Sequence, residues 1–504
     1  MGVVIKQSFW SSFWAYIGVV LGYLSTLLIL PTFMTLEEMG LFRLVFSNAL
    51  LIAPFITLGM PGTYLKFFPE FRENVEQDKR IYSFQLFTIL AAAALFGIFV
   101  FFFDDWIESY FAAEAPEYNQ YIWVSFGIMV LHALFLHFHA FSRSHFDIIL
   151  PNFLKEVYLR LGNIVLVGFY AVGLLTFNNM LYAILIVYGS SIGIQLWFLL
   201  KNHNFHLSLQ LFKISNEWYK KLTNFSTYSL ALTASTSIYS NISFAMIAST
   251  LGNSLNGIYT VCFYIGVVIE MPKRSMAQIM SPILSKAYKE NKFEEIESLY
   301  KRSSLTLGSI ALLFFLGICC NLNDLFNLIP KGESFRLGTY VVFSVAVAKV
   351  VDMIFSVNSD IIIYSKYYKY NLLFFIPCAL LIIWFNDLFL PTLGITGAGI
   401  SFLLATVLFN VVKFIFIWYK FKIVPFSKGH ISLFLVSGVI YAIFWFTPLT
   451  GNPIFDVILR SAGITILFLT SIYIFKISPD INNLIRVVFS KYLNIQLPPY
   501  EKQS

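Results

Sequence analysis

The chain has 504 residues, of which 58% are hydrophobic, 18% aromatic and only 12% charged. Soluble domains carry about 25% charged residues, and no water-surrounded core of this size buries 55 phenylalanine side chains. The composition therefore excludes a soluble protein and predicts a polytopic integral membrane protein. Four cysteines, all in apolar runs, exclude a disulfide framework.

Fourteen stretches are long and apolar enough to cross a bilayer, since each span needs roughly 20 residues for about 30 Å of hydrocarbon. The loops between them are too short to fold alone, so no soluble catalytic domain is inserted. In chain order the predicted spans are residues 8–30, 43–65, 83–103, 121–141, 153–175, 181–200, 223–250, 257–280, 304–322, 338–358, 371–387, 396–418, 431–449 and 456–476.

The positions of lysine and arginine predict the orientation, because these residues concentrate in short cytoplasmic loops. Each interval without them is long enough for an outward span, a turn and a return span. The basic loops between these intervals, and both termini, are therefore predicted to be cytoplasmic. The net charge of +7 is a topology signal and not a nucleic-acid footprint. The intervals without lysine or arginine are 81–142, 161–200, 222–272, 370–412 and 429–459.

A weak internal repeat relates residues 38–42, which follow the first span, to residues 255–259, which follow the seventh. Gly40 and Gly257 occupy equivalent places in it, 257 − 40 = 217 residues apart. Two bundles related by a repeat, with a site near the midplane, are usual in alternating-access transporters. The spacing predicts an N-terminal six-helix lobe at 1–200, a cytoplasmic linker at 201–222, a C-terminal six-helix lobe at 223–420, two additional transmembrane helices at 421–476 and a cytoplasmic tail at 477–504.

Charged residues inside predicted spans are the functional candidates, because a charge at the bilayer centre costs at least ~2.5–3.5 kcal/mol on insertion scales. Pro272 interrupts the eighth span, and three charged residues flank it: Glu270, Lys273 and Arg274. In one interpretation the two cations bind an anionic head group and Glu270 couples or tunes them. In the other the helix ends near Ile269 and these charges face cytoplasmic water.

The tenth span carries a lysine too deep for easy snorkelling. Lys349 lies about halfway along it, and Asp352 follows one turn later, within pairing distance on the same face. The two residues form either a structural ion pair or a cavity cation with a titratable partner.

Arginines supply the candidates of the first half. Arg160 lies about 10 Å deep in the fifth span by helix rise, and Glu156 four residues before it can pair with it. Arg43 is a rare cation on the predicted outer side. For cations nearer span ends, snorkelling to the interface is the favoured interpretation; these are Arg43 itself, Lys66, Lys413 and Arg460.

Metal and enzyme motifs are missing from the sequence. His137 and His139 in the fourth span are two residues apart and cannot share a helix face, whereas His132 and His139 can. No carboxylate lies in that span, so no metal site is predicted. The sequence contains no Gly-rich phosphate loop, HExxH or CxxC motif and encodes no nucleotide-binding domain. We therefore expect neither an enzyme nor an ATP-driven pump, with no catalytic residues and no cofactor.

Four local patterns carry a resemblance to a known family. The sequence resembles the polysaccharide biosynthesis proteins of the multidrug/oligosaccharidyl-lipid/polysaccharide (MOP) exporter superfamily, which act as lipid-linked oligosaccharide flippases. The patterns are Lys6-Gln7-Ser8-Phe9-Trp10 running into Tyr16-Ile17-Gly18, Glu38-Met39-Gly40-Leu41-Phe42-Arg43, Leu58-Gly59-Met60-Pro61, and Leu393-Gly394-Ile395-Thr396-Gly397-Ala398-Gly399.

This resemblance implies a V-shaped pair of six-helix lobes around a cationic central cavity. Such a protein moves an undecaprenyl-diphosphate-linked oligosaccharide from the inner to the outer leaflet, for surface polysaccharide synthesis. Arginine and lysine give the charge-assisted hydrogen bonds that a diphosphate needs. Asp352 and Glu270 would be the couplers in an antiport model. By depth, the substrate-binding candidates are Lys349, Lys273, Arg274, Arg160 and Arg43.

The expected setting is the bacterial inner (cytoplasmic) membrane, as a multi-pass protein. The expected partners are the lipid-linked substrate, membrane lipids and polysaccharide assembly proteins, and no nucleic acid. Energy would come from a proton or sodium gradient or from consumption of the product outside. Two alternatives stay open. A drug or small-molecule exporter of the same fold should prefer acidic cavity residues. A membrane glycosyltransferase or polysaccharide polymerase is disfavoured by the short outer loops.

Overall fold

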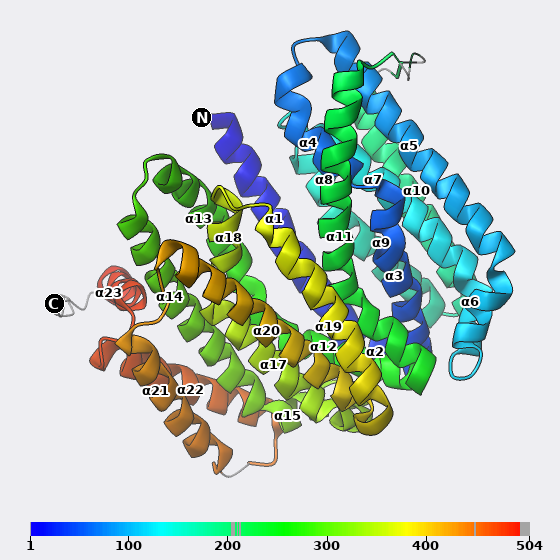
Figure 1. Ribbon diagram of the computed structural model, residues 1–504. Helices are drawn as coiled ribbons and strands as arrows, with labels where there is room; N and C mark the ends of the chain where they lie inside the picture. Colours follow the sequence, from blue (N-terminus) through cyan, green and yellow to red (C-terminus); the bar gives the residue numbers. More distant parts are fainter. Residues whose placement is uncertain (1, 203–206, 209, 211–212, 448–449, 494–504) are drawn as a thin grey trace. The chain divides into compact units, whose positions relative to one another are not determined.

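The computed structural model describes residues 2–202, 207–208, 210, 213–447 and 450–493. Every regular element in these ranges is helical, and they contain no strand (Figure 1). The chain divides into two compact units: Met1–Val261 with Ala379–Ile395, and Cys262–Cys378 with Thr396–Ser504. Three helices contribute residues to both units: α12 (Asn253–Val267), α19 (Tyr370–Leu393) and, by its first residue alone, α20 (Ile395–Phe421).

The first unit contains most of the N-terminal helices. In chain order they are α1 (Gly2–Leu24), η1 (Ser25–Ile29), α2 (Leu30–Phe33), α3 (Leu36–Thr57), α4 (Met60–Phe71), α5 (Val75–Phe102), α6 (Asp104–Phe111), η2 (Pro116–Tyr121), α7 (Ile122–Ser144), α8 (Ile149–Phe153), η3 (Leu154–Tyr158), α9 (Leu159–Ala171), α10 (Phe177–Asn202) and α11 (Asn216–Leu251).

The second unit follows from the end of α12. Its helices are η4 (Val268–Glu270), α13 (Met271–Lys289), α14 (Phe293–Cys319), α15 (Leu322–Leu328), α16 (Gly332–Phe335), η5 (Arg336–Gly338), α17 (Thr339–Ile354), α18 (Asn358–Tyr364), the start of α19, α20 (Ile395–Phe421) except its first residue, α21 (Lys428–Trp445), α22 (Pro453–Ile474) and α23 (Pro479–Leu493).

Thirteen helical segments among the described residues are long and apolar enough to span a membrane. They overlap thirteen of the predicted spans. The fifth prediction, residues 153–175, coincides with the continuous helical run α8–η3–α9, where Lys155, Glu156 and Arg160 interrupt the apolar sequence. The prediction of an all-α membrane protein with about fourteen transmembrane helices is therefore confirmed. The cytoplasmic placement of the termini and the predicted lobe boundaries stay predictions.

The boundaries predicted for the second span, 43–65, are wrong because the helix breaks at Leu58. The span starts earlier, at a capping box: the Thr35 hydroxyl accepts from the Glu38 N–H at 3.1 Å, and the Glu38 carboxylate accepts from the Thr35 N–H at 2.8 Å. It stops where Leu58 adopts left-handed backbone, with φ 48°. The Ser226 hydroxyl of α11 donates to the Leu58 carbonyl and so satisfies a group at the break.

Aromatic side chains of α4, α5 and α7 form a core of the first unit. The Tyr64 hydroxyl donates to the Asp78 carboxylate at 2.7 Å, and the Tyr64 ring stacks on Phe141. His137, fully buried, stacks on Tyr82 with ring centroids 4.3 Å apart. His137 therefore serves as a packed core side chain. A separate core of the second unit includes Leu284, Ile296, Tyr300, Ile361 and Ile417.

Candidate functional site

The eighth predicted span is broken, because the 3₁₀ turn η4 separates α12 from α13. Pro272 is the second residue of α13, where its missing N–H costs no helical hydrogen bond. The break places Glu270 at the end of η4 and Lys273 in the first turn of α13. The helix does end near Ile269, but α13 continues from it at once.

Lys273 forms an ion pair with Asp352 in the last turn of α17. Its Nζ donates to Asp352 Oδ2 at 2.7 Å and to the Asp352 backbone carbonyl at 3.2 Å. Both side chains are mostly buried. The charge of Lys273 is therefore directed at α17 and not at open water.

Lys349, one turn before Asp352 on α17, pairs with Glu270. Its side chain is only 10% exposed, and its Nζ lies 5.1 Å from the centre of the Phe402 ring. The sequence suggested that Lys349 and Asp352 pair with each other along the helix. The structure gives each of them a partner from the η4–α13 break instead, so two ion pairs join α17 to that break.

A third lysine belongs to the same region. Lys413 on α20 is 1% exposed, and its Nζ donates to the Ser359 hydroxyl at 2.7 Å. The Nζ also lies 3.6 Å from the centre of the Phe409 ring, a cation–π contact. The prediction that Lys413 snorkels is wrong, because α20 extends to Phe421, about two turns beyond it.

Two asparagines complete the hydrogen bonding around Asp352. The Asn410 amide donates to Asp352 Oδ1 at 3.2 Å, and the Asn358 amide donates to Asn410 Oδ1 at 2.9 Å. Asn410 and Lys413 are three residues apart and share one face of an otherwise apolar helix. That polar face is the sequence signal by which Lys413 was identifiable as a site residue.

Asp360 on the short helix α18, outside the spans, adds a further carboxylate. Burial raises the pKa of its carboxyl above the usual range, although Lys273 and Lys413 nearby favour the charged form. Together six charged residues form what we call the lysine–carboxylate cluster. Its three lysines and three acids have no net formal charge, which differs from a purely cationic wall. The members are Glu270, Lys273, Lys349, Asp352, Asp360 and Lys413.

The two ion pairs are the contacts of this cluster that another ion could replace. A lysine held by a carboxylate binds another anion when that carboxylate is protonated or displaced, because breaking a buried pair leaves a costly unpaired charge. Arg274 lies beside Lys273 on α13, and its side chain lies outside the part of the chain that the structure describes.

Arg160 and Arg43 lie in the first unit and have different partners. Arg160 Nη2 lies 3.3 Å from Glu156 Oε2, as the four-residue spacing predicted. Its guanidinium packs against α1 at Gly22. A Cβ added to Gly22 would lie 3.7 Å from the Arg160 Cζ. The Arg43 Cζ lies 3.8 Å from the centre of the Phe244 ring, so this arginine stacks on α11.

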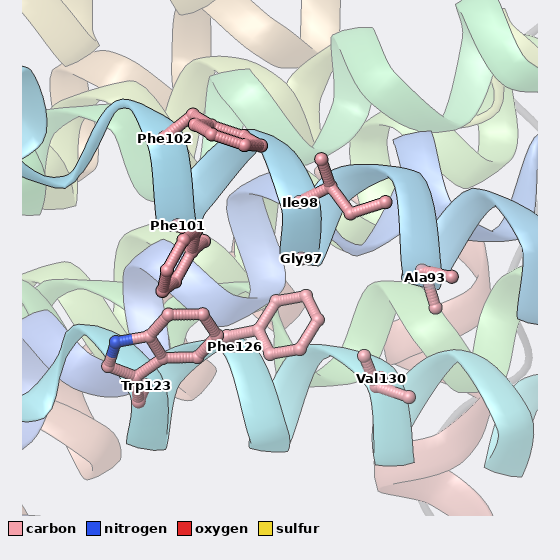
Figure 2. A pocket seen from close by; sticks show the side chains of 9 residues that line it. Ala93, Gly97, Ile98, Phe101, Phe102, Trp123, Phe126 and Val130 are labelled. Atoms are coloured by element: carbon pink, nitrogen blue, oxygen red, sulfur yellow. The ribbon is translucent and has the colours of Figure 1, made fainter.

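A second region, a groove between α5 and α7, is apolar (Figure 2). It measures about 470 Å³, and Figure 2 shows Phe101 of α5 near Trp123 and Phe126 of α7. Gly97 leaves space for the Phe126 ring, because a Cβ added to Gly97 would lie 3.0 Å from that ring. No ionisable side chain lines the groove, so it suits hydrocarbon and not a charged group.

Metal binding has no support from the arrangement of side chains. Within the described ranges, no group of three or more His, Cys, Asp or Glu residues is placed to hold an ion. His139 Nε2 instead hydrogen-bonds the Asn152 side chain at 2.9 Å.

Comparison with known proteins identifies the fold. No protein-family model matches the sequence, and no curated protein sequence matches it. Among solved structures, the chain is similar to the lipid II flippase MurJ in its inward closed conformation, with a TM-score of 0.78 at 12% identity, over 94% of this chain and 99% of that one.

Two further structures are similar over most of their length. One is an inward-facing multidrug resistance MATE family transporter of the MOP superfamily, with a TM-score of 0.65 at 16% identity, covering 80% of this chain and 94% of that one. The other is a MATE in the straight conformation, with a TM-score of 0.53 at 18% identity, covering 84% and 93%. At these identities the likeness shows a shared fold.

Proposed function

We propose that this protein is a flippase that moves a lipid-diphosphate-linked oligosaccharide across the bacterial cytoplasmic membrane for surface polysaccharide biosynthesis. The observation that carries the proposal is the lysine–carboxylate cluster, in a fold similar to that of a lipid flippase. The proposed mechanism is alternating access, with no catalytic step.

The diphosphate is the part of such a substrate that needs hydrogen-bond donors from the protein. It accepts several charge-assisted hydrogen bonds, which lysine and arginine donate. In the proposed mechanism it replaces Glu270 on Lys349 and Asp352 on Lys273, the two pairs that join α17 to the break at η4. Arg274, Arg160 and Arg43 are proposed as further phosphate contacts.

The two carboxylates couple transport to an ion gradient in this proposal. Protonation of Glu270 or Asp352 removes the charge that holds the lysine, so that the lysine is free to bind phosphate. A sodium ion that binds these carboxylates has the same effect. Outward release then restores the ion pairs, and consumption of the oligosaccharide outside draws the cycle forward.

Deletion of the gene tests the function directly. Lipid-linked intermediates would be extracted and their leaflet assigned by access to an added glycosidase. We expect intact intermediates to accumulate on the cytoplasmic leaflet and surface polysaccharide to be lost. Truncated glycans would contradict the proposal and indicate a transferase or polymerase.

Site variants test the cluster within the same assay. The double variant Lys349→Met/Glu270→Gln removes one pair without leaving an unpaired charge, and Lys273→Met/Asp352→Asn removes the other. Both should abolish export while the protein stays folded. The matched control is Lys286→Met, a lysine of the same α13 that is 75% exposed. Normal export by both double variants would refute the assignment.

Drug export is the second candidate, because the cluster contains as many carboxylates as lysines and two structural neighbours are MATE transporters. In that case the deletion strain would become sensitive to cationic dyes and keep normal surface polysaccharide. The flippase proposal predicts the opposite pattern.

A further inference from the structure

A polar cavity lies in the second unit, and α17 is the one helix that contributes both to it and to the lysine–carboxylate cluster. It measures about 330 Å³, at the lower end of the roughly 300–1,000 Å³ typical of small-molecule sites. Helices α14, α15, α17, α21 and α22 contribute to it. Its polar lining includes Asn323, Asp324, Thr339, Thr447 and Arg460.

A buried ion pair lies in the wall of this cavity. Arg460 on α22 is 9% exposed in its side chain and Asp324 on α15 is 6% exposed. Arg460 Nη1 lies 3.0 Å from Asp324 Oδ2 and donates to the Cys320 carbonyl at 3.0 Å. The prediction that Arg460 snorkels is therefore wrong. One role of the pair is to attach α22 to α15.

Attachment uses only part of the hydrogen-bonding capacity of the two side chains. Within the described residues, the bonds of Arg460 all come from Nη1 and the bond to Asp324 is accepted by Oδ2. Nε and Nη2 of Arg460 and Oδ1 of Asp324 keep their capacity, and none of them is a fully enclosed, unsatisfied atom. Donors and an acceptor are thus available side by side in a lining of no net charge.

Aromatic rings form another part of the lining. Phe343, Phe444 and Trp445 line the cavity, and Trp445 is 56% exposed. A neutral ion pair favours neither an anion nor a cation. A hydroxyl group both donates and accepts, and the apolar face of a sugar ring packs on aromatic faces as other apolar groups do. The combination matches a neutral, polyhydroxylated ring.

We propose that this cavity binds one pyranose residue of an oligosaccharide. The identification of that oligosaccharide with the transported glycan rests on the proposed function. Helices α21 and α22, the two additional spans of the sequence, supply Trp445 and Arg460 to it. Their role is then recognition of the glycan as well as packing.

The test is binding of the full-length, detergent-solubilised protein to an array of immobilised bacterial surface oligosaccharides. The wild type should bind at least one glycan. Trp445→Ala should weaken that binding at least tenfold, and its exposed position makes it compatible with folding. The matched control is Trp384→Ala, another exposed tryptophan, 59% exposed and outside the cavity lining, which should bind as the wild type does.

A second variant, Asp324→Asn/Arg460→Gln, removes both charges together and should also lose binding. The inference is overturned if the wild type binds no glycan on the array. It is equally overturned if Trp445→Ala and the double variant, folded by size-exclusion chromatography, bind like the wild type. Neither result depends on export. If deletion abolishes export but the protein binds no glycan, this inference fails and the flippase proposal stands. If the protein binds glycan but export is normal after deletion, only the flippase proposal fails.

Discussion

Gly40 of α3 and Gly257 of α12 lie backbone against backbone. A Cβ on Gly40 would lie 2.9 Å from the Gly257 nitrogen, and a Cβ on Gly257 would lie 3.2 Å from the Gly40 nitrogen. The Asn256 side chain donates to the Gly40 carbonyl at 3.0 Å, and this hydrogen bond joins α12 to α3 where the two helices cross. These are the two glycines that the weak sequence repeat paired, so the residues matched by the repeat are also neighbours in space.

Gly40→Ala should therefore destabilise the protein. The added methyl would also meet the Asn253 backbone, and overpacking of this kind typically costs about 1–3 kcal/mol. Thermal unfolding in detergent measures the effect. The control is Gly168→Ala, since a Cβ there meets nothing within 4 Å; if both variants unfold at the wild-type temperature, the close helix crossing is contradicted.

The Lys349–Glu270 pair predicts strong coupling between two substitutions. Lys349→Met alone and Glu270→Gln alone each leave a buried charge without its partner, at a cost of about 3–5 kcal/mol. The double variant removes both charges and should be more stable than either single variant. A thermal-unfolding double-mutant cycle gives the coupling energy. Additive effects would mean that the two side chains do not act as a pair.

Asp360 predicts a pH dependence of stability. Burial raises the pKa of its carboxyl in the folded protein, so the folded state holds this proton more tightly than the unfolded state. Stability is then lost as pH rises from the ordinary Asp value of about 3.9 through the raised folded pKa. Asp360→Asn cannot ionise, so it should unfold at a higher temperature than the wild type at pH 7.

The control for this prediction is the same pair of proteins well below the ordinary Asp pKa of about 3.9. There Asp360 is protonated in both the folded and the unfolded state, so the unfolding temperatures of the two proteins should converge. An advantage of Asp360→Asn that is equal at low pH and at pH 7 would contradict the titration of Asp360 as its cause.

Ser226→Ala tests the break at Leu58. The hydroxyl of Ser226 is a hydrogen-bond donor to the Leu58 carbonyl, and its loss leaves a mostly buried acceptor unsatisfied, at about 1–3 kcal/mol. Ser240→Ala is the matched control, because that exposed hydroxyl only donates to the Thr236 carbonyl of its own helix. Equal unfolding temperatures for the two variants would show that the break does not depend on α11.

Apolar runs were sufficient to predict an all-α membrane protein with about fourteen spans, because a helix in lipid needs roughly 20 mostly apolar residues. Helix ends were less predictable. Helix α3 stops because Leu58 adopts left-handed backbone, and leucine is not a residue type that marks a helix end. The fifth predicted span coincides with a helical run that contains Lys155, Glu156 and Arg160 and is not among the thirteen apolar segments, so it stays a prediction.

Partners across helices were beyond the sequence. Spacing along α17 suggested that Lys349 pairs with Asp352. Each of them instead pairs with a residue of η4 or α13. Helix packing decides these partners, and spacing along one helix does not reveal them. Lys413 and Arg460 were assigned to the interface from their distance to a span end. Depth does not reveal which face a side chain lies on, and in both cases that face is buried.

The π turn η3 (Leu154–Tyr158) has a consequence for movement. It lies directly before α9, which carries Arg160, and it packs against α1, which leads into a second π turn, η1 (Ser25–Ile29). A π turn holds about one residue more than an α turn, so converting it advances the following helix by roughly 1.5 Å and turns it by about 100°. Such a register slip inside the helix would change the direction that Arg160 faces, with no loop opening.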